Sequence, residues 1–291
     1  MNPRRGSWIA ASTCVLFLCI FTACSGAATL EVGSGKTYAT IQEAIAAASG
    51  GDEIVVSAGT YAECINFAGK SVTVRSIDPA NPAVVAGTII DGGAAGSVVT
   101  FNSGEGASAV LMGLTITNGS GTLNSYGGFD GGGIYCSGSS PTIAKNVIIG
   151  NSALGTLAAG GGIVCHSGAN ALIDCNTIST NTTGGFNTYG GGIACFGSSP
   201  TISGNLIMGN TAPMLGGGIY ANQTSGGMIS GNTIGGNAST SYGGGVCLVG
   251  SPTLSGNLIT ANTASTRGAG VYVNNTASPV IEGNTISGNT G

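Results

Sequence analysis

The chain has 291 residues, of which 55 are glycine, while only 6% are charged and 5% are aromatic. This composition excludes a coiled coil or helical bundle, which needs Ala, Glu, Lys and Leu in helical periodicity, and the clustering of the glycines excludes collagen. With 42% apolar residues and a net charge of −4 the chain can build a core, and its acidic balance argues against a nucleic-acid partner.

The first residues are typical of an export signal. Arg4 and Arg5 precede an apolar run over residues 8–21, and small residues then continue to Ala28. This order predicts a signal peptide over residues 1–27 and places the protein outside the cytoplasm, in a bacterial envelope or secreted. No later segment is long and apolar enough to predict a transmembrane helix.

Two cleavage sites fit this signal. Residues 25–27 offer small side chains to an ordinary signal peptidase, whereas residues 21–24 resemble a bacterial lipobox with Cys24 as the lipid-bearing residue. Phe21 departs from the Leu that is usual there. Plain secretion and a lipid anchor therefore both remain open.

Repeats dominate the rest of the chain. Glycine-rich triplets followed by Ile or Val recur at intervals of 29, 30, 26, 27 and 25 residues, beginning at Gly131, Gly160, Gly190, Gly216, Gly243 and Gly268. Each is followed by Ile-x-x-Asn-x-Ile-x-x-Asn, in which Leu254 replaces one Ile. The asparagines are Asn146/Asn151, Asn176/Asn181, Asn205/Asn210, Asn232/Asn237, Asn257/Asn262 and Asn284/Asn289.

Such short β-branched pieces between Gly, Asn, Ser and Pro predict strands joined by turns. One repeat cannot bury its apolar side alone, but stacked repeats share a continuous core, so the isoleucines are predicted to form inward columns. The asparagines are expected to form amide ladders and to accept left-handed backbone angles. The glycine triplets are expected at corners where a Cβ would clash.

Residues 37–61 resemble the opening of many members of the pectin lyase-like superfamily. The resemblance implies a right-handed parallel β-helix whose first coil is capped by a short helix over residues 40–48, with a first strand at residues 54–56. The paired repeat elements also resemble the repeats of polymorphic outer membrane proteins. The predicted fold class is thus all-β, a domain over residues 28–291 with eight or nine coils and regular repeats over residues 126–291.

Earlier coils are predicted at residues 72–74, 88–90, 98–101 and 110–117, with a loop insertion at residues 77–82. The chain ends at Gly291 within a repeat and without a polar capping segment. This indicates a fragment of a longer protein, or end-to-end association through the last coil, because an open strand edge pairs with other chains.

Few residues could perform catalysis. Polysaccharide lyases and hydrolases of this fold need grouped ionisable side chains, but residues 126–291 supply only Asp130, Lys145, His166, Asp174, Arg267 and Glu282. The two aspartates are predicted to lie on different strands. His166 is expected to be a lone solvent-facing histidine without a partner carboxylate, so no catalytic residue is assigned.

Two motif-like segments carry no site. Residues 33–37 end like a phosphate-binding loop, but the glycine that the motif requires is Leu30, and we interpret the segment as a linker without a preceding buried strand. Residues 127–130 do not match the calcium-binding nonapeptide. We therefore assign no metal and no cofactor.

Three of the six cysteines outside the signal are predicted to stack. Cys136, Cys165 and Cys195 follow the triplet Ile by two residues in consecutive repeats, which brings them within reach of a disulfide. They could equally be small apolar residues filling a column.

The position between the triplet Ile and this column is predicted to face outward. It holds Tyr135, Val164, Ala194, Tyr220, Cys247 and Tyr272, while Tyr189 and Tyr242 directly precede a triplet. Exposed tyrosines beside Asn, Ser and Thr could bind a glycan, or they could be ordinary strand surface.

The sequence favours an exported, non-enzymatic β-helix, an adhesin-like module that presents a polar face to a polysaccharide or a surface protein. The alternative is a carbohydrate-active enzyme, either a pectate lyase-like lyase or a glycoside hydrolase. It is supported by the fold resemblance alone.

Overall fold

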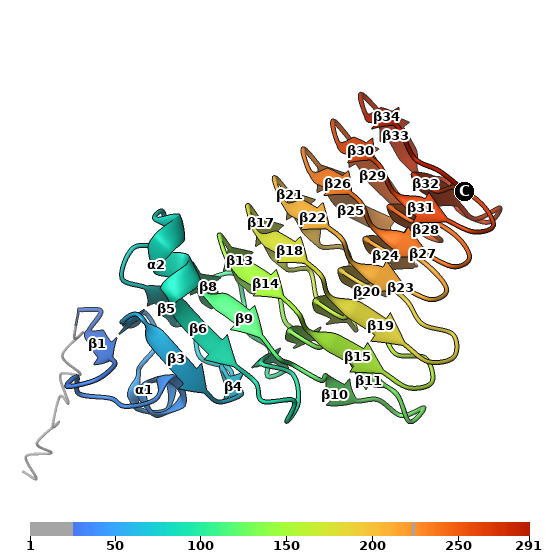
Figure 1. Ribbon diagram of the computed structural model, residues 1–291. Coiled ribbons are helices and arrows are strands. Elements are labelled where there is room, and N and C mark those ends of the chain that lie inside the picture. Colours follow the sequence, from blue (N-terminus) through green and yellow to red (C-terminus); the bar gives the residue numbers. More distant parts are fainter. Residues whose placement is uncertain (1–25, 223–224) are drawn as a thin grey trace, which may run out of the picture.

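The computed structural model describes residues 26–222 and 225–291, which form a parallel β-solenoid of about nine coils. The coils stack in chain order from the N-terminal end to the C-terminal end (Figure 1). The solenoid is right-handed, so the predicted fold class and number of coils are confirmed. Residues 1–25 of the predicted signal peptide, including Cys24, lie outside the described residues.

Three parallel sheets form the walls of the solenoid, and each regular coil adds one strand to each of them. Sheet A contains β1 (Thr29–Val32), β2 (Glu53–Val56), β5 (Thr73–Ser76), β8 (Val110–Met112), β13 (Thr142–Ala144), β17 (Leu172–Asp174), β21 (Thr201–Ser203), β25 (Ser225–Ser230), β29 (Ser251–Ser255) and β33 (Val280–Glu282). Sheet B contains β3 (Gly59–Ala62), β6 (Thr88–Asp91), β9 (Thr115–Thr117), β14 (Val147–Ile149), β18 (Thr177–Ser179), β22 (Leu206–Met208), β26 (Thr233–Gly235), β30 (Leu258–Thr260) and β34 (Thr285–Ser287). Sheet C contains β4 (Ile65–Asn66), β7 (Val99–Phe101), β12 (Ile134–Ser137), β16 (Ile163–His166), β20 (Ile193–Phe196), β24 (Ile219–Asn222), β28 (Val246–Leu248) and β32 (Val271–Val273).

Two smaller sheets complete the coils. A five-stranded parallel sheet follows sheet B in the regular repeats and consists of β15 (Ser152–Leu154), β19 (Thr182–Gly184), β23 (Thr211–Ala212), β27 (Ala238–Ser239) and β31 (Thr263–Ala264). The other is an antiparallel hairpin of β10 (Thr122–Leu123) and β11 (Phe129–Asp130). This hairpin interrupts the repeat pattern just before the first glycine triplet.

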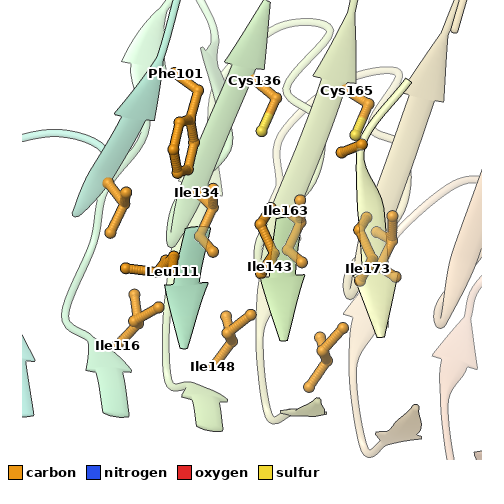
Figure 2. Close-up of a cluster of buried hydrophobic side chains, with 14 of the residues drawn as sticks. Phe101, Leu111, Ile116, Ile134, Cys136, Ile143, Ile148, Ile163, Cys165 and Ile173 are labelled. Atoms are coloured by element: carbon orange, nitrogen blue, oxygen red, sulfur yellow. The ribbon is translucent and has the colours of Figure 1, made fainter. Parts of the chain in front are cut away.

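The core consists of the predicted isoleucine columns. Ile143 and Ile148 of one coil lie in register with Ile173 and Ile178 of the next, and all four are fully buried. Figure 2 shows part of these columns, with the cysteine sulfur atoms lying beside them. Each buried isoleucine contributes roughly 1.5–3 kcal/mol before the entropy cost of folding is subtracted.

Two buried asparagine ladders hold the turns on either side of sheet B. The Oδ1 of Asn210 accepts hydrogen bonds from the backbone N and the Nδ2 of Asn181, at 3.0 and 3.1 Å. Its own Nδ2 donates to the backbone oxygen of Ile178 and to Oδ1 of Asn237. The predicted ladders are therefore present, and they satisfy buried backbone groups that would otherwise lack partners.

The left-handed backbone belongs to a different residue from the one predicted. No ladder asparagine in the described regular repeats has a positive φ; the residue before each of them does. This residue is glycine in most coils, but it is Lys145, Cys175, Thr180 and Ala261 in others, with φ between 50° and 56°. The asparagines keep a negative φ, and their amides form the hydrogen bonds of the ladder.

The predicted capping helix is present as α1 (Ile41–Ala47), which begins after a capping box formed by Thr40 and Glu43. The Glu63 carboxylate accepts hydrogen bonds from the first two backbone amides of the helix, at 2.8 and 2.9 Å. The Lys70 ammonium donates to three backbone oxygens at its C-terminal end, at 2.6, 2.6 and 2.8 Å. Charges of the appropriate sign therefore bind both ends of the helix.

Two expectations for the N-terminal region are wrong: that no buried strand precedes residues 33–37, and that residues 54–56 form the first strand. Strand β1 precedes residues 33–37 and pairs in parallel with β2, which contains residues 54–56. The reason is that Leu30 and Val32 alternate with polar residues and pack on the core. Beyond the predicted insertion at residues 77–82, the chain forms a second short helix, α2 (Pro82–Gly87), with Asn81 as its N-cap.

The glycine triplets lie where a Cβ would clash, as predicted. A Cβ built on Gly191 would lie 2.5 Å from the backbone oxygen of Thr211 and 2.6 Å from that of Gly217. No helix in the described part of the chain is long and apolar enough to cross a membrane.

Candidate functional site

The outer face of sheet C is more deeply buried than predicted. Val164, Ala194 and Cys247 are fully buried and Tyr220 is nearly so, while Tyr135 and Tyr272 are half-buried. These side chains do point away from the main core, but they form a second apolar cluster. The prediction that this row is exposed is therefore wrong.

A further layer of chain covers this row. The residue before each glycine triplet pairs with its equivalent in the next coil, giving a column of Asp130, Ala159, Tyr189, Leu215, Tyr242 and Arg267. Because the triplets have no side chains, the chain approaches sheet C closely, and the preceding residue lies over the outward row. This covering column turns a strand surface into a walled groove.

The groove lies at the start of the regular repeats and has a volume of about 550 Å³. Its aromatic lining consists of Tyr126, Tyr135, Tyr189, Phe196 and Tyr220. Its polar lining includes Asn124, Ser125, Ser137, Ser167 and Asn222. Asp130 and His166 also line it, and within the described residues no Lys or Arg does.

The aromatic side chains contact one another along the groove. The imidazole of His166 stacks on the Phe196 ring, with centroids 5.1 Å apart and an interplanar angle of 15°. The Tyr135 ring lies 5.9 Å from the imidazole, and the Phe196 ring lies 5.3 Å from that of Tyr220. The rings thus form a continuous apolar wall across several coils.

His166 has a partner carboxylate, contrary to our expectation. Its Nε2 lies 3.1 Å from Oδ2 of Asp130, and the two side chains are 23% and 6% exposed. His166 is therefore neither alone nor fully solvent-facing. The two residues are 36 positions apart in the sequence, which is why their pairing was missed.

The hairpin places Asp130 opposite the histidine. Asn124, between β10 and β11, donates from Nδ2 to Oδ1 of Asp130 at 3.1 Å and to the backbone oxygen of Leu157 at 3.2 Å. Its Oδ1 accepts from the backbone amides of Tyr126 and Gly128. One signal was available in the sequence: Asp130 precedes a triplet, as Tyr189 does, and therefore belongs to the covering column.

Burial keeps the phenols and the thiol of this region neutral. It raises the pKa of Tyr189 and, more strongly, that of Tyr220. It also raises the pKa of Cys247 to about 12. The aromatic surface of the groove is therefore neutral at neutral pH, and Asp130 and His166 are the acidic and basic side chains of its lining.

The other ionisable candidates are not brought into this groove. Lys145 and Asp174 lie at the turn between sheets A and B, where the Lys145 amide donates to the backbone oxygen of Asp174. Glu282 lies on β33 of sheet A, and Arg267 ends the covering column. No group of three or more His, Cys, Asp or Glu side chains in the described residues could hold a metal ion.

The predicted cysteine stack is present in the core. Cys136, Cys165 and Cys195 are register partners on β12, β16 and β20, and all three are buried with free thiols. Hydrogen bonding to Cys165 and burial raise the pKa of Cys136 and of Cys195. The disulfide remains a prediction, and the column fills the core as the alternative interpretation expected.

One comparison with known proteins identifies a family for the regular repeats. Residues 132–291 match the family model described as the right-handed beta helix region. A search of curated proteins finds no significant match. Among solved structures, the chain is similar to the crystal structure of a pectin methylesterase from Aspergillus niger, with 15% identity and a TM-score of 0.45 over 92% of this chain and 87% of that chain.

Proposed function

Because the chain belongs to the right-handed β-helix family, whose model matches residues 132–291, we propose that the solenoid is a rigid support for a saccharide-binding groove. The observation that carries this proposal is the lining of the groove, in which aromatic rings stand beside amide and hydroxyl groups. Apolar walls with a few placed polar groups are typical of small-molecule sites. Sugars present both kinds of surface, C–H faces and hydroxyl edges.

The charges of the groove favour a neutral saccharide. An anionic uronate would bring a carboxylate close to Asp130, and none of the described lining residues is a Lys or Arg that could pair with it. Neutral sugars need only hydrogen bonds and apolar contact, which the lining supplies. We therefore propose a neutral glycan as the ligand class.

Binding is best tested on the purified protein by calorimetric titration with neutral and uronate-containing oligosaccharides. We expect neutral oligosaccharides to bind and uronates not to bind. Tyr126 is 68% exposed and lines the groove, so Tyr126→Ala should weaken binding by up to about tenfold, since an aromatic contact contributes about 0.5–1.5 kcal/mol.

Phe186→Ala is the matched control, because Phe186 is 71% exposed but does not line the groove. Equal losses of saccharide affinity in the two variants would show that binding does not take place in this groove. Tighter binding of uronates than of neutral sugars would overturn the proposed ligand class.

We also propose that the protein works outside the cytoplasm, secreted or anchored by lipid through Cys24. The proposal rests on the order of charged, apolar and small residues over positions 1–27. Mass spectrometry of the N-terminus of the exported protein tests it. A diacylated Cys24 supports the anchor, an N-terminus near Ala28 supports plain secretion, and an uncleaved chain contradicts both.

A further inference from the structure

His166 is arranged as an oriented base. Its Nε2 faces Oδ2 of Asp130, whose other oxygen accepts from Asn124. A carboxylate in this place fixes the imidazole tautomer, so that Nε2 carries the proton and Nδ1 has a free lone pair. Nδ1 makes no hydrogen bond with any described residue. A pair of this kind is suited to take a proton from a neighbouring hydroxyl group.

A hydroxyl group of the required kind stands on the adjacent strand. Ser137 is the register partner of His166 in the parallel pairing of β12 with β16, and neighbouring strands lie about 4.8 Å apart. Both side chains leave the outer face of sheet C and line the same groove. Ser137 Oγ likewise has no hydrogen-bond partner among the described residues.

We propose that Ser137, His166 and Asp130 form a hydrolytic triad that cleaves an acyl ester in the groove. A nucleophile, a base and a group that orients the base occur here in one cavity, and such a constellation is recognised by geometry and not by sequence order. The inference against catalysis rested on the scarcity and separation of the ionisable residues, and His166 was also expected to lack a partner carboxylate. The contact with Asp130 corrects the second point and brings two of those few residues together.

The chemistry balances without a cofactor. Ser137 Oγ attacks the acyl carbon while its proton passes to Nδ1 of His166, and the ester C–O bond breaks as the alcohol leaves with that proton. Water then attacks the acyl-serine, again giving its proton to Nδ1, and the carboxylic acid departs as Ser137 recovers its proton. Asp130 stabilises the imidazolium in both steps. The Tyr135 side chain lines the same groove, and we assign its hydroxyl to the developing oxyanion.

The natural substrate class depends on the proposed function: if the groove holds a neutral glycan, the ester is an O-acylated sugar. The triad itself can be tested without any sugar. The purified protein is incubated with p-nitrophenyl acetate and, separately, with a fluorophosphonate that reacts covalently with activated serines.

We expect p-nitrophenol release and phosphonylation of Ser137, located by peptide mass spectrometry. Ser137→Ala should abolish labelling, and both Ser137→Ala and His166→Gln should lower turnover by at least about a hundredfold. Ser179→Ala on β18, outside the groove, is the matched control and should retain both signals.

Circular dichroism and the melting temperature establish that each variant is folded. A folded protein that neither reacts with the fluorophosphonate nor exceeds Ser137→Ala in turnover would overturn the triad. Labelled Ser137 in a protein that binds no saccharide would overturn only the sugar-ester assignment. Saccharide binding without labelling would leave the proposed function standing and reject this inference.

Discussion

At the scale of single residues, the turns between coils require a left-handed backbone conformation. The residue before each ladder asparagine is left-handed, and Thr180 adopts this conformation with a φ of 50°. A β-branched residue is strained there, whereas Gly209 occupies the equivalent position of the next coil without strain. Thr180 therefore stores conformational strain that its neighbours do not.

Thr180→Gly should consequently stabilise the protein. Relief of about 1–3 kcal/mol of backbone strain outweighs the 0.4–1 kcal/mol of extra chain entropy that glycine adds to the unfolded state. We expect a net gain of about 1 kcal/mol, measured as a higher midpoint in urea unfolding. Gly209→Ala is the converse control and should lose stability; a less stable Thr180→Gly variant would contradict the strain argument.

Glu105 links stability to pH. Burial alone would raise its pKa, but hydrogen bonds from Ser139 Oγ and from the Gly69 and Ser103 amides outweigh burial and hold the pKa below its usual 4.5. Because its pKa is lower in the folded state, Glu105 contributes fully to the free energy of unfolding above pH 4.5. This contribution is lost as the pH falls through the folded-state pKa. The carboxylate therefore stabilises the protein at neutral pH.

Glu105→Gln should lower the melting temperature at pH 7 and flatten its decrease between about pH 5 and pH 3. Thermal unfolding across this range measures both effects. The exposed Glu43→Gln is the comparison for a carboxylate at the surface. An unchanged pH profile in Glu105→Gln would show that another group controls acid stability.

At the scale of elements, helix α1 depends on residues outside itself. Seven residues are too few for a stable isolated helix. The helix relies on its buried face and on Glu63 and Lys70 at its two ends. Neither residue belongs to the helix in sequence, so the sequence predicted the helix but not what holds its ends.

Lys70→Met should loosen α1 while keeping the length of the side chain. Three charge-assisted hydrogen bonds to backbone oxygens are lost, and we expect a cost of about 2 kcal/mol. Hydrogen exchange should show faster exchange at the Ala48 amide, which bonds to Ala44. Lys36→Met removes only an exposed ion pair with Glu31 and should change neither the stability nor the exchange rate at Ala48 appreciably. Equal changes in the two variants would refute a specific role for Lys70.

At the scale of the whole molecule, the repeat explains which features could be predicted. Six copies of Ile-x-x-Asn-x-Ile-x-x-Asn define the isoleucine columns, the asparagine ladders and the sheets, because each copy forms the same strands and turns. The covering column and the groove depend on how glycine triplets fold the chain against sheet C, which no single copy reveals. The contact between Asp130 and His166 joins an irregular hairpin to a regular strand, so periodicity could not indicate it.

Close packing makes the glycine triplets sensitive to substitution. In Gly191→Ala the new methyl group would meet backbone oxygens of Thr211 and Gly217, which belong to neighbouring segments and cannot move aside as a flexible side chain would. Each coil contacts only its neighbours, so a shift in one coil propagates along the stack. We expect a loss of about 3 kcal/mol in urea unfolding, the upper range for over-packing.

Gly106→Ala provides the matched substitution, because a Cβ at that residue would meet no other heavy atom within 4 Å. It should change stability by less than about 0.5 kcal/mol. If both variants unfold at the same urea concentration, close approach is not the reason for the triplets. If only Gly191→Ala is destabilised, the glycine is required by its close approach to the backbone of Thr211 and Gly217.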